Sequence, residues 1–345
     1  MDFIDSIRLY RYCLPLVTPI AWQDKFHSYR EGLLLCLKRS EKEGWGEIAP
    51  LPGFSRESLM DAEIQGVWLV RLLRNREIDL FKSSILLAHP SVQFGFESAW
   101  YDLGPEDRSK SKSKLLPVAC CKLLDSKDYK QNKPINFKDN HGSKAVKIKV
   151  GKQSLGHDLA FIHEVYENNP GLEIRIDANR RWSLKTAKEF LYSTRSLSLG
   201  YIEEPLRDKT ELKTFTSSSH IPLALDETLR EPDAALYKQL ADIYVLKPTL
   251  SGGITKTATE IQQAETDHTR CIISSSYESG IGMLKLLELA RTIPDEIHGL
   301  DTYQVFERDV FKKQLPLHSP ILQPDMPSIK ERDIDIAFLK QVVEL

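Results

Sequence analysis

The sequence predicts an α/β protein in which a TIM-type barrel follows a smaller α+β domain. Beyond residue 116, short apolar segments rich in β-branched residues alternate with helical segments, and this β–α order is typical of a parallel sheet that closes into a barrel. Before residue 105, alternating strand-like segments come first and helical segments follow them, which is typical of a separate α+β domain. Five consecutive segments of the barrel region also end in a charged residue.

The first fifty residues are predicted to form an antiparallel sheet. Its strands are IRLYRYCLPL at 7–16, REGLLLCLKRS at 30–40 and WGEIAPL at 45–51, with a turn at Lys42–Gly44 between the last two. Proline and glycine at 50–53 then end the strand pattern, because proline lacks the N–H that a sheet needs.

Two helices are predicted to complete this domain. Ser55 is the expected N-cap of a helix that runs to about Arg74. Apolar residues follow at helical spacing, namely Ile64, Val67, Trp68 and Leu72. A second helix is expected over 90–102. The polar stretch PEDRSKSKSK at 105–114 has no periodicity and predicts an exposed linker.

The barrel region contains eight candidate strands, separated by helical stretches such as 154–168 and 183–197. The strands are PVACCKLL, KAVKIKV, LEIRID, LGYIEE, PLALDE, ADIYVLK, RCIISS and EIHGLD. We therefore expect a capping domain over 1–104, a linker over 105–115 and a barrel with the active site over 116–305. The C-terminal segment over 306–345 is expected to pack back on the cap.

Composition limits the class of protein. Hydrophobic residues make up 41% of the chain and charged residues 28%, as in soluble globular proteins. A formal net charge of −2 predicts neither nucleic-acid binding nor a membrane-surface patch. The start MDFIDSIRLY has no signal-peptide pattern, and the five cysteines form no CxxC pair. We expect a cytoplasmic protein with reduced thiols, present as a monomer or weak homo-oligomer.

The charged strand ends predict a site. They are Lys149, Asp177, Glu203, Asp226 and Lys247, separated by 28, 26, 23 and 21 residues. The carboxyl ends of barrel strands converge on one face, where the chemistry of such barrels lies. One such residue alone is usually a helix cap or a solvated charge, whereas five in the same relative position favour a site. Three carboxylates without histidine or cysteine suit Mg²⁺, with Mn²⁺ as a substitute.

The stretch AVKIKVG at 145–151 places two lysines on one side of a strand, because alternate residues of a strand face the same way. Two lysines on one side of so apolar a strand indicate that their charge is used. An amine that accepts a proton must first be neutral. A second positive charge close by disfavours the protonation of either lysine.

These motifs together resemble a known family. KIK at 147–149, DAN at 177–179, EEP at 203–205, DE at 226–227 and KP at 247–248 are similar to the enolase superfamily and to its muconate-lactonizing subgroup. Within the subgroup, GWGEIAPLPGFS at 44–55, RIDANRRW at 175–182 and LKPTLSGG at 246–253 resemble the o-succinylbenzoate synthase family. The resemblance implies an enolase-like, modified (β/α)7β barrel with an α+β capping domain.

The resemblance also implies roles for individual residues. Asp177, Glu203 and Asp226 become the ligands of Mg²⁺, while Glu204 faces away from the site. Lys149 becomes the general acid/base, and Lys247 stands on the opposite face of the substrate. With Lys149 in that role, we interpret Lys147 as the residue whose positive charge tunes the pKa of Lys149. The residues implied to bind a dicarboxylate substrate are Arg175, Asn179, Ser274 and the Gly299 backbone. Segments 24–29 and 53–55 are the candidates for a cover over the site.

The implied reaction is a lyase reaction of menaquinone biosynthesis. In a syn dehydration, 2-succinyl-6-hydroxy-2,4-cyclohexadiene-1-carboxylate loses water and gives 2-succinylbenzoate. An alternative is an N-acylamino acid racemase or dipeptide epimerase of the same subgroup. The loop PTLSGG after Lys247 lacks the acidic DxD pair expected of a dipeptide enzyme. A further alternative is a non-catalytic binding protein, against which the retention of five costly charges argues.

Overall fold

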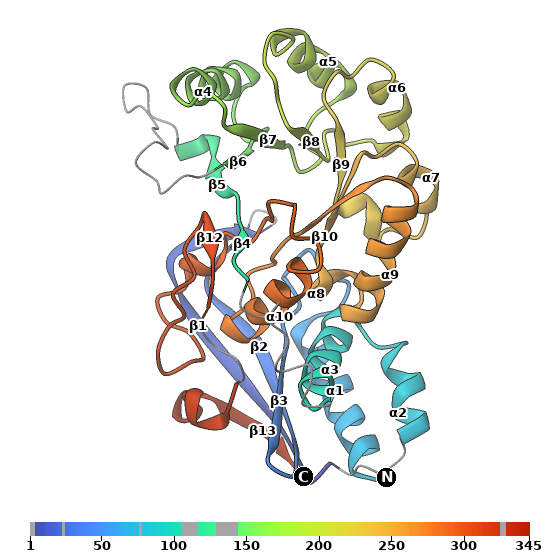
Figure 1. Ribbon diagram of the computed structural model, residues 1–345, viewed down its shortest axis with the longest axis vertical. Coiled ribbons are helices and arrows are strands. Elements are labelled where there is room, and N and C mark those ends of the chain that lie inside the picture. Colours follow the sequence, from blue (N-terminus) through green and yellow to red (C-terminus); the bar gives the residue numbers. More distant parts are fainter. Residues whose placement is uncertain (1–3, 23–24, 76–77, 105–115, 129–143, 325–328) are drawn as a thin grey trace.

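The computed structural model describes residues 4–22, 25–75, 78–104, 116–128, 144–324 and 329–345. The predicted linker at 105–115 lies outside the described residues. Within them, the chain forms an antiparallel sheet with three helices and, beyond it, a parallel sheet whose strands alternate with helices (Figure 1). No helix among the described residues is long and apolar enough to cross a membrane.

The antiparallel sheet has the strand order β13–β1–β2–β3. Its strands are β1 (Ser6–Trp22), β2 (Lys25–Arg39), β3 (Lys42–Ile48) and, from the other end of the chain, β13 (Lys340–Glu344). Alternate residues of β2 enter two different cores. Leu33, Leu35 and Leu37 pack toward the cap helices, whereas Leu34 and Cys36 join the core shared with the barrel. The sheet is therefore covered on both faces along β2.

Three helices, α1 (Leu59–Arg74), α2 (Ile78–Ile85) and α3 (Pro90–Asp102), cover one face of this sheet. Helix α3 spans the predicted range. It approaches β3 so closely that a side chain at Gly46 would place its Cβ 1.8 Å from the Gly95 carbonyl oxygen. Two glycines are thus needed where the helix crosses the strand.

The prediction for α1 was wrong in two respects. Its N-cap is Ser58, whose Oγ accepts the Asp61 N–H while the Asp61 carboxylate accepts the Ser58 N–H. Ser55 instead accepts the Leu51 N–H and holds the turn that precedes the helix. The buried face of α1 also differs from the predicted one, because Ile64 and Trp68 are exposed. The residues of α1 that are buried are Ala62, Gly66, Leu69, Val70, Leu72 and Leu73.

The parallel sheet has seven strands in the order β11–β10–β9–β8–β7–β6–β5. They are β5 (Lys122–Asp125), β6 (Ala145–Lys149), β7 (Glu173–Asp177), β8 (Tyr201–Glu203), β9 (Leu223–Leu225), β10 (Ile243–Leu246) and β11 (Arg270–Ile273). The predicted eighth strand is reduced to residues 298–299, which bridge Cys120 on one side and Ser274 on the other. A short pair of β4 (Val118–Ala119) and β12 (Ile321–Leu322) lies beside this closure. The fold is a parallel β/α barrel with an α+β cap, as the sequence predicts.

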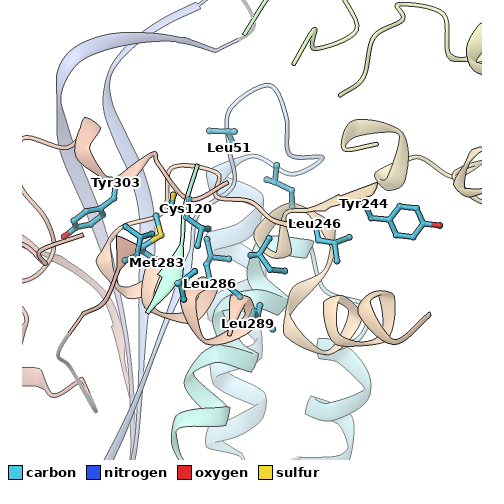
Figure 2. Close-up of a cluster of buried hydrophobic side chains, with 14 of the residues drawn as sticks. Leu51, Cys120, Tyr244, Leu246, Met283, Leu286, Leu289 and Tyr303 are labelled. Carbon is cyan, nitrogen blue, oxygen red and sulfur yellow. The ribbon is translucent and has the colours of Figure 1, made fainter. Parts of the chain in front are cut away.

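Helices follow the strands of the barrel. They are α4 (Leu155–Asn168), α5 (Leu184–Ser193), α6 (Leu212–Thr216), α7 (Ala235–Lys238), α8 (Pro248–Ser251), α9 (Gly253–Thr266) and α10 (Gly280–Ala290). Figure 2 shows how Met283, Leu286 and Leu289 of α10 meet Cys120 and Leu246 of the sheet in a buried apolar cluster. This packing fixes the sheet against the helix that faces the cap.

The cap is attached to the barrel through carboxylates at helix N-termini. Glu47 of β3 accepts the N–H groups of Ser279 and Gly282 at 2.9 Å each, and therefore caps α10 from the other domain. Glu97 of α3 accepts the N–H groups of Ile254 and Thr255 and caps α9 in the same way. A negative charge at a helix N-terminus offsets the exposed N–H dipoles there.

Candidate active site

The register of the parallel sheet brings the charged strand ends together. Lys149 pairs with Asp177 across β6 and β7, and Asp177 pairs with Glu203 across β7 and β8. Asp226 and Lys247 directly follow β9 and β10. A cavity of about 520 Å³ opens at these ends. Seven of the predicted residues line it: Lys147, Lys149, Asp177, Asn179, Lys247, Ser274 and Gly299.

The three lysines differ in their surroundings. Lys147 Nζ lies 3.1 Å from Glu203 Oε2 and 3.6 Å from Asp177 Oδ2. Lys247 Nζ donates to Asp226 Oδ2. Among the described residues, Lys149 Nζ has no hydrogen-bond or ion-pair partner, and its side chain is half-buried against the cavity. Lys149 is therefore the amine that is available to a substrate proton.

Two carboxylates of the site have raised pKa values, because they are buried close to other negative charges. Burial, and then repulsion from Asp177, raises the pKa of Glu203 to about 7. Burial and the charge of Asp226 raise the pKa of Glu227 to about 8. The pKa values of Lys147 and Lys247 are also raised, because the attraction of their carboxylate partners outweighs the opposing effect of burial.

The residues present fit a hard divalent ion. The donors are oxygens only, which suits Mg²⁺ and Mn²⁺. Glu227 Oε2 is buried and has no hydrogen-bond partner among the described residues, so a cation bound at this site would satisfy it. As the described side chains stand, no three acidic, histidine or cysteine side chains converge closely enough to hold an ion. The ammonium groups of Lys147 and Lys247 lie against the three carboxylates instead.

Glu204 directly follows β8, does not line the cavity and is fully buried. Its carboxylate accepts the N–H groups of Asp226 at 2.9 Å and Thr228 at 2.7 Å, and the guanidinium of Arg180 at 2.9 Å. Arg180 is therefore held against this buried carboxylate at the edge of the cavity. Glu204, which Arg180 holds in place, therefore fixes the backbone of the segment that contains Asp226.

The prediction that Arg175 binds a substrate carboxylate is not supported by its position. Arg175 is buried, does not line the cavity, and donates to Glu173 Oε1 at 2.8 Å and to the Ile297 carbonyl at 2.6 Å. It shares a face with Asp177 but sits two residues earlier in β7. Because two strand residues separate it from Asp177, Arg175 lies closer to the amino-terminal end of the barrel, beneath the site.

Several cavity residues were missed by the sequence analysis. They are Trp22, Arg56, Cys121, Lys152, Arg181, Glu227, Arg230 and Glu231. The motif DE at 226–227 was a signal for Glu227. Gly53 and Phe54 belong to the segment 53–55 that was expected to cover the site, and both line the cavity. Trp22 lies close in sequence to the other expected segment, 24–29, of which Asp24 lies outside the described residues. The arginines carry no local pattern, because only tertiary packing brings them to the cavity.

Comparison with known proteins gives the class of this molecule. Residues 136–327 match the family described as Enolase C-terminal domain-like, and residues 4–103 match the family described as MenC, N-terminal domain. The chain therefore belongs to the enolase superfamily. An o-succinylbenzoate synthase from Haemophilus influenzae is 32% identical over 343 residues, covering 98% of this chain and 99% of the relative. One from Escherichia coli O81 is 31% identical over 329 residues, covering 93% and 98%. Within the superfamily, the chain is an enzyme of the o-succinylbenzoate synthase family.

Solved structures of other proteins share the fold of this chain. A dipeptide epimerase from Cytophaga hutchinsonii, complexed with Mg and a dipeptide, has a TM-score of 0.80 and 21% identity, with full coverage of both chains. A member of the enolase superfamily from Roseovarius nubinhibens, complexed with magnesium, has a TM-score of 0.78 and 17% identity, with 99% of each chain covered. At these identities the likeness concerns the fold.

Proposed function

We propose that this protein catalyses the syn dehydration of 2-succinyl-6-hydroxy-2,4-cyclohexadiene-1-carboxylate to 2-succinylbenzoate, in menaquinone biosynthesis in the cytoplasm. The observation that carries the proposal is a pair of lysines that line one cavity: Lys247 is paired with Asp226, whereas Lys149 has no partner in the part of the chain that the structure describes. The o-succinylbenzoate synthases that align with almost the whole chain support this particular substrate.

Lys149 serves both proton transfers in this scheme. As a neutral amine, it takes the proton on the carbon next to the substrate carboxylate, and that C–H electron pair moves toward the carboxylate. The resulting ammonium then delivers the same proton to the departing hydroxyl group, which leaves as water while the ring becomes aromatic. One residue on one face is sufficient, because the proton and the hydroxyl leave from the same side.

The other residues stabilise charge and hold the substrate. Lys247 remains an ammonium against Asp226 and offsets the negative charge that develops on the substrate from the opposite face. Asn179, Ser274 and the Gly299 backbone line the cavity and supply polar groups for the substrate. Asp177, Glu203 and Asp226 would hold Mg²⁺, which supplies a Lewis acid for the substrate carboxylate when it is bound. That Lys147 tunes Lys149 stays a prediction. The charge of Lys147 is itself offset by two carboxylates.

Chelation tests the metal-dependent reaction. Purified protein should form 2-succinylbenzoate from the cyclohexadiene substrate, lose this activity in excess EDTA and regain it on addition of Mg²⁺ or Mn²⁺. The formation of the aromatic product can be followed by ultraviolet absorbance and confirmed by mass spectrometry. Full turnover in excess EDTA would remove the metal from the proposal, and the absence of product under all conditions would remove the reaction.

A further inference from the structure

One arginine at the rim of the cavity contacts both the cap and a proposed metal ligand. Arg230 ends the 3-10 helix Glu227–Arg230, four residues after Asp226. Its Nη2 lies 3.4 Å from Asp226 Oδ1, and its Nη1 donates to the Phe54 carbonyl at 3.2 Å. The proposed reaction assigns this side chain no role, although it lines the cavity.

The partner of Arg230 in the cap is a tight turn, residues 51–56, which we call the cover segment. Within it, the N–H groups of Phe54 and Ser55 both donate to the Leu51 carbonyl. Its last residue, Arg56, donates through Nη2 to the backbone carbonyl of Arg230. Hydrogen bonds thus run in both directions between the cover segment and Arg230. Gly53 and Phe54 of the same segment line the cavity.

On the barrel side, Arg230 shares one carboxylate with Lys247. Asp226 is fully buried, and its Oδ2 accepts Lys247 Nζ while its Oδ1 faces Arg230 Nη2. The orientation of this carboxylate therefore depends on two cations. One of them is Lys247, which is proposed to offset the charge that develops on the substrate, and the other is Arg230, which is held in place by a carbonyl of the cap.

We propose that Arg230 is a positioning residue that couples the placement of the cover segment to the orientation of Asp226. The inference rests on the proposed function in that Asp226 is taken as a metal ligand. When the cover segment is docked, the planar guanidinium reaches the Phe54 carbonyl and Asp226 Oδ1 together. When the segment is displaced, Asp226 loses a fixed partner. The cap then affects affinity for the divalent ion without contacting the ion's ligands.

The variant Arg230→Lys keeps the positive charge but gives up the planar fork that spans two acceptors. The affinity of the substrate-free protein for Mg²⁺, measured by isothermal titration calorimetry, should fall about tenfold, as is usual when the partner of a metal ligand is lost. Hydrogen–deuterium exchange in the cover segment should become faster than in the wild type. Neither readout requires turnover.

The variant Arg56→Met removes the bond from the cover side and touches no atom of Asp226. It should weaken Mg²⁺ binding in the same direction, with a smaller effect, and speed hydrogen–deuterium exchange over residues 226–231. Combined with Arg230→Lys, its effect should be less than additive, because both changes break the same connection. Arg308→Met is the matched control, since Arg308 also pairs with an aspartate, Asp335 at 2.6 Å, but does not line the cavity.

Wild-type affinity and wild-type exchange at 226–231 in Arg56→Met would overturn the coupling, even if Arg230→Lys proved too unstable to study. Equal effects from Arg308→Met would overturn it as well. If the wild-type protein failed to form 2-succinylbenzoate while the two arginine variants behaved as expected, the proposed function would fail and the coupling would stand. If the wild type bound no Mg²⁺, the exchange rates alone would decide.

Discussion

At the scale of single residues, the contacts of three lysines separate their roles. Lys147 and Lys247 are paired with buried carboxylates, so their charge is offset and their amines are occupied. Lys149 faces the same cavity without such a partner among the described residues. Only Lys149 is placed to take a substrate proton in the structure as it stands, which favours a reaction on one face over a reaction that needs a base on each face.

This difference predicts different outcomes for two substitutions. Lys149→Ala should reduce formation of 2-succinylbenzoate to the limit of detection, since general acid–base catalysis contributes roughly 10²–10⁴-fold and here serves both proton transfers. Lys247→Arg keeps the positive charge and cannot act as a base, because arginine stays protonated. Part of the dehydration should therefore survive in that variant. Steady-state kcat for both variants provides the measurement.

Solvent deuterium exchange gives the corresponding control. Racemisation of an N-acylamino acid needs a base on each face, so any such side activity should vanish in both variants. If Lys247→Arg exchanged the α-proton of both enantiomers at the wild-type rate, Lys247 would not be the group on the opposite face, and the assignment of the two lysines would be wrong.

At the scale of elements, helices of the barrel depend on carboxylates of the cap. Glu47 accepts hydrogen bonds from the Ser279 N–H, the Ser279 hydroxyl, the Gly282 N–H and the Tyr12 hydroxyl. Helix α10 begins at Gly280, and the loop that leads into it from Ser274 lines the cavity. Glu47 is thus a buried helix-capping residue that joins the two domains. We therefore expect it to contribute more to stability than an exposed surface carboxylate does.

The variant Glu47→Gln should lower the free energy of unfolding by about 1–3 kcal/mol. It removes the negative charge from the helix N-terminus and places amide hydrogens against groups that also donate. Glu189→Gln is a suitable control, because Glu189 is exposed and lies 4.0 Å from Lys185 on the surface of α5. Urea unfolding of both variants provides the measurement. Equal losses would show that Glu47 is not a special contact between the domains.

How far the sequence predicts the elements depends on whether their signals are local. The range of α3 and the strands that end at Lys149, Asp177 and Glu203 follow from turn residues and short β-branched runs. The start of α1 was misplaced because Ser55 and Ser58 are both plausible caps, and only the side-chain pairing of Ser58 with Asp61 decides between them. The roles of Glu47, Arg175 and Arg230 were not predictable, because each depends on a backbone contact far away in the sequence. These contacts are the Gly282 N–H for Glu47, the Ile297 carbonyl for Arg175 and the Phe54 carbonyl for Arg230.

At the scale of the whole molecule, one histidine should make stability depend on pH. His298 lies in the strand segment that closes the barrel and is fully buried. Its Nδ1 accepts the Ile273 N–H at 3.1 Å, which leaves Nε2 to donate to the Ile293 carbonyl at 3.2 Å. Burial lowers the pKa of His298 to about 4, so the folded protein keeps this ring neutral where the unfolded chain would protonate it. Its contacts are those of a structural residue.

The contribution of His298 to stability should therefore fall as the pH decreases from about 6.5 to 4, by up to about 3 kcal/mol. Asp309 acts in the opposite direction, because burial raises its pKa to about 6 and its protonation favours the folded state. Glu203 and Glu227, whose pKa values are also raised, act in the same direction as Asp309. The comparison of wild type with His298→Asn isolates the histidine, since these three carboxylates are common to both proteins. Urea unfolding between pH 7 and pH 4.5 should show a shallower loss in the variant. The exposed His220→Asn should keep the wild-type slope, and an identical slope in all three proteins would contradict the assignment.

The fold itself does not decide between the two enzymatic functions. Dipeptide epimerases share the architecture at about one-fifth identity, whereas o-succinylbenzoate synthases align with nearly the whole chain at about 30%. The cavity holds a lysine on each side, which both reactions use. The distinction lies in whether Lys247 is required as a base or only as a charge, and in which substrate the cap admits.

The most direct test of the proposed function compares the two reactions in one preparation of the wild-type protein with Mg²⁺. The kcat/KM for formation of 2-succinylbenzoate and the kcat/KM for epimerisation of an alanyl-glutamate dipeptide are measured side by side. We predict that dehydration is favoured by at least about a thousandfold, because a site built for one set of polar groups rejects a substrate that leaves them unpaired. Comparable values, or a preference for the dipeptide, would contradict the assignment of this protein as a dehydratase.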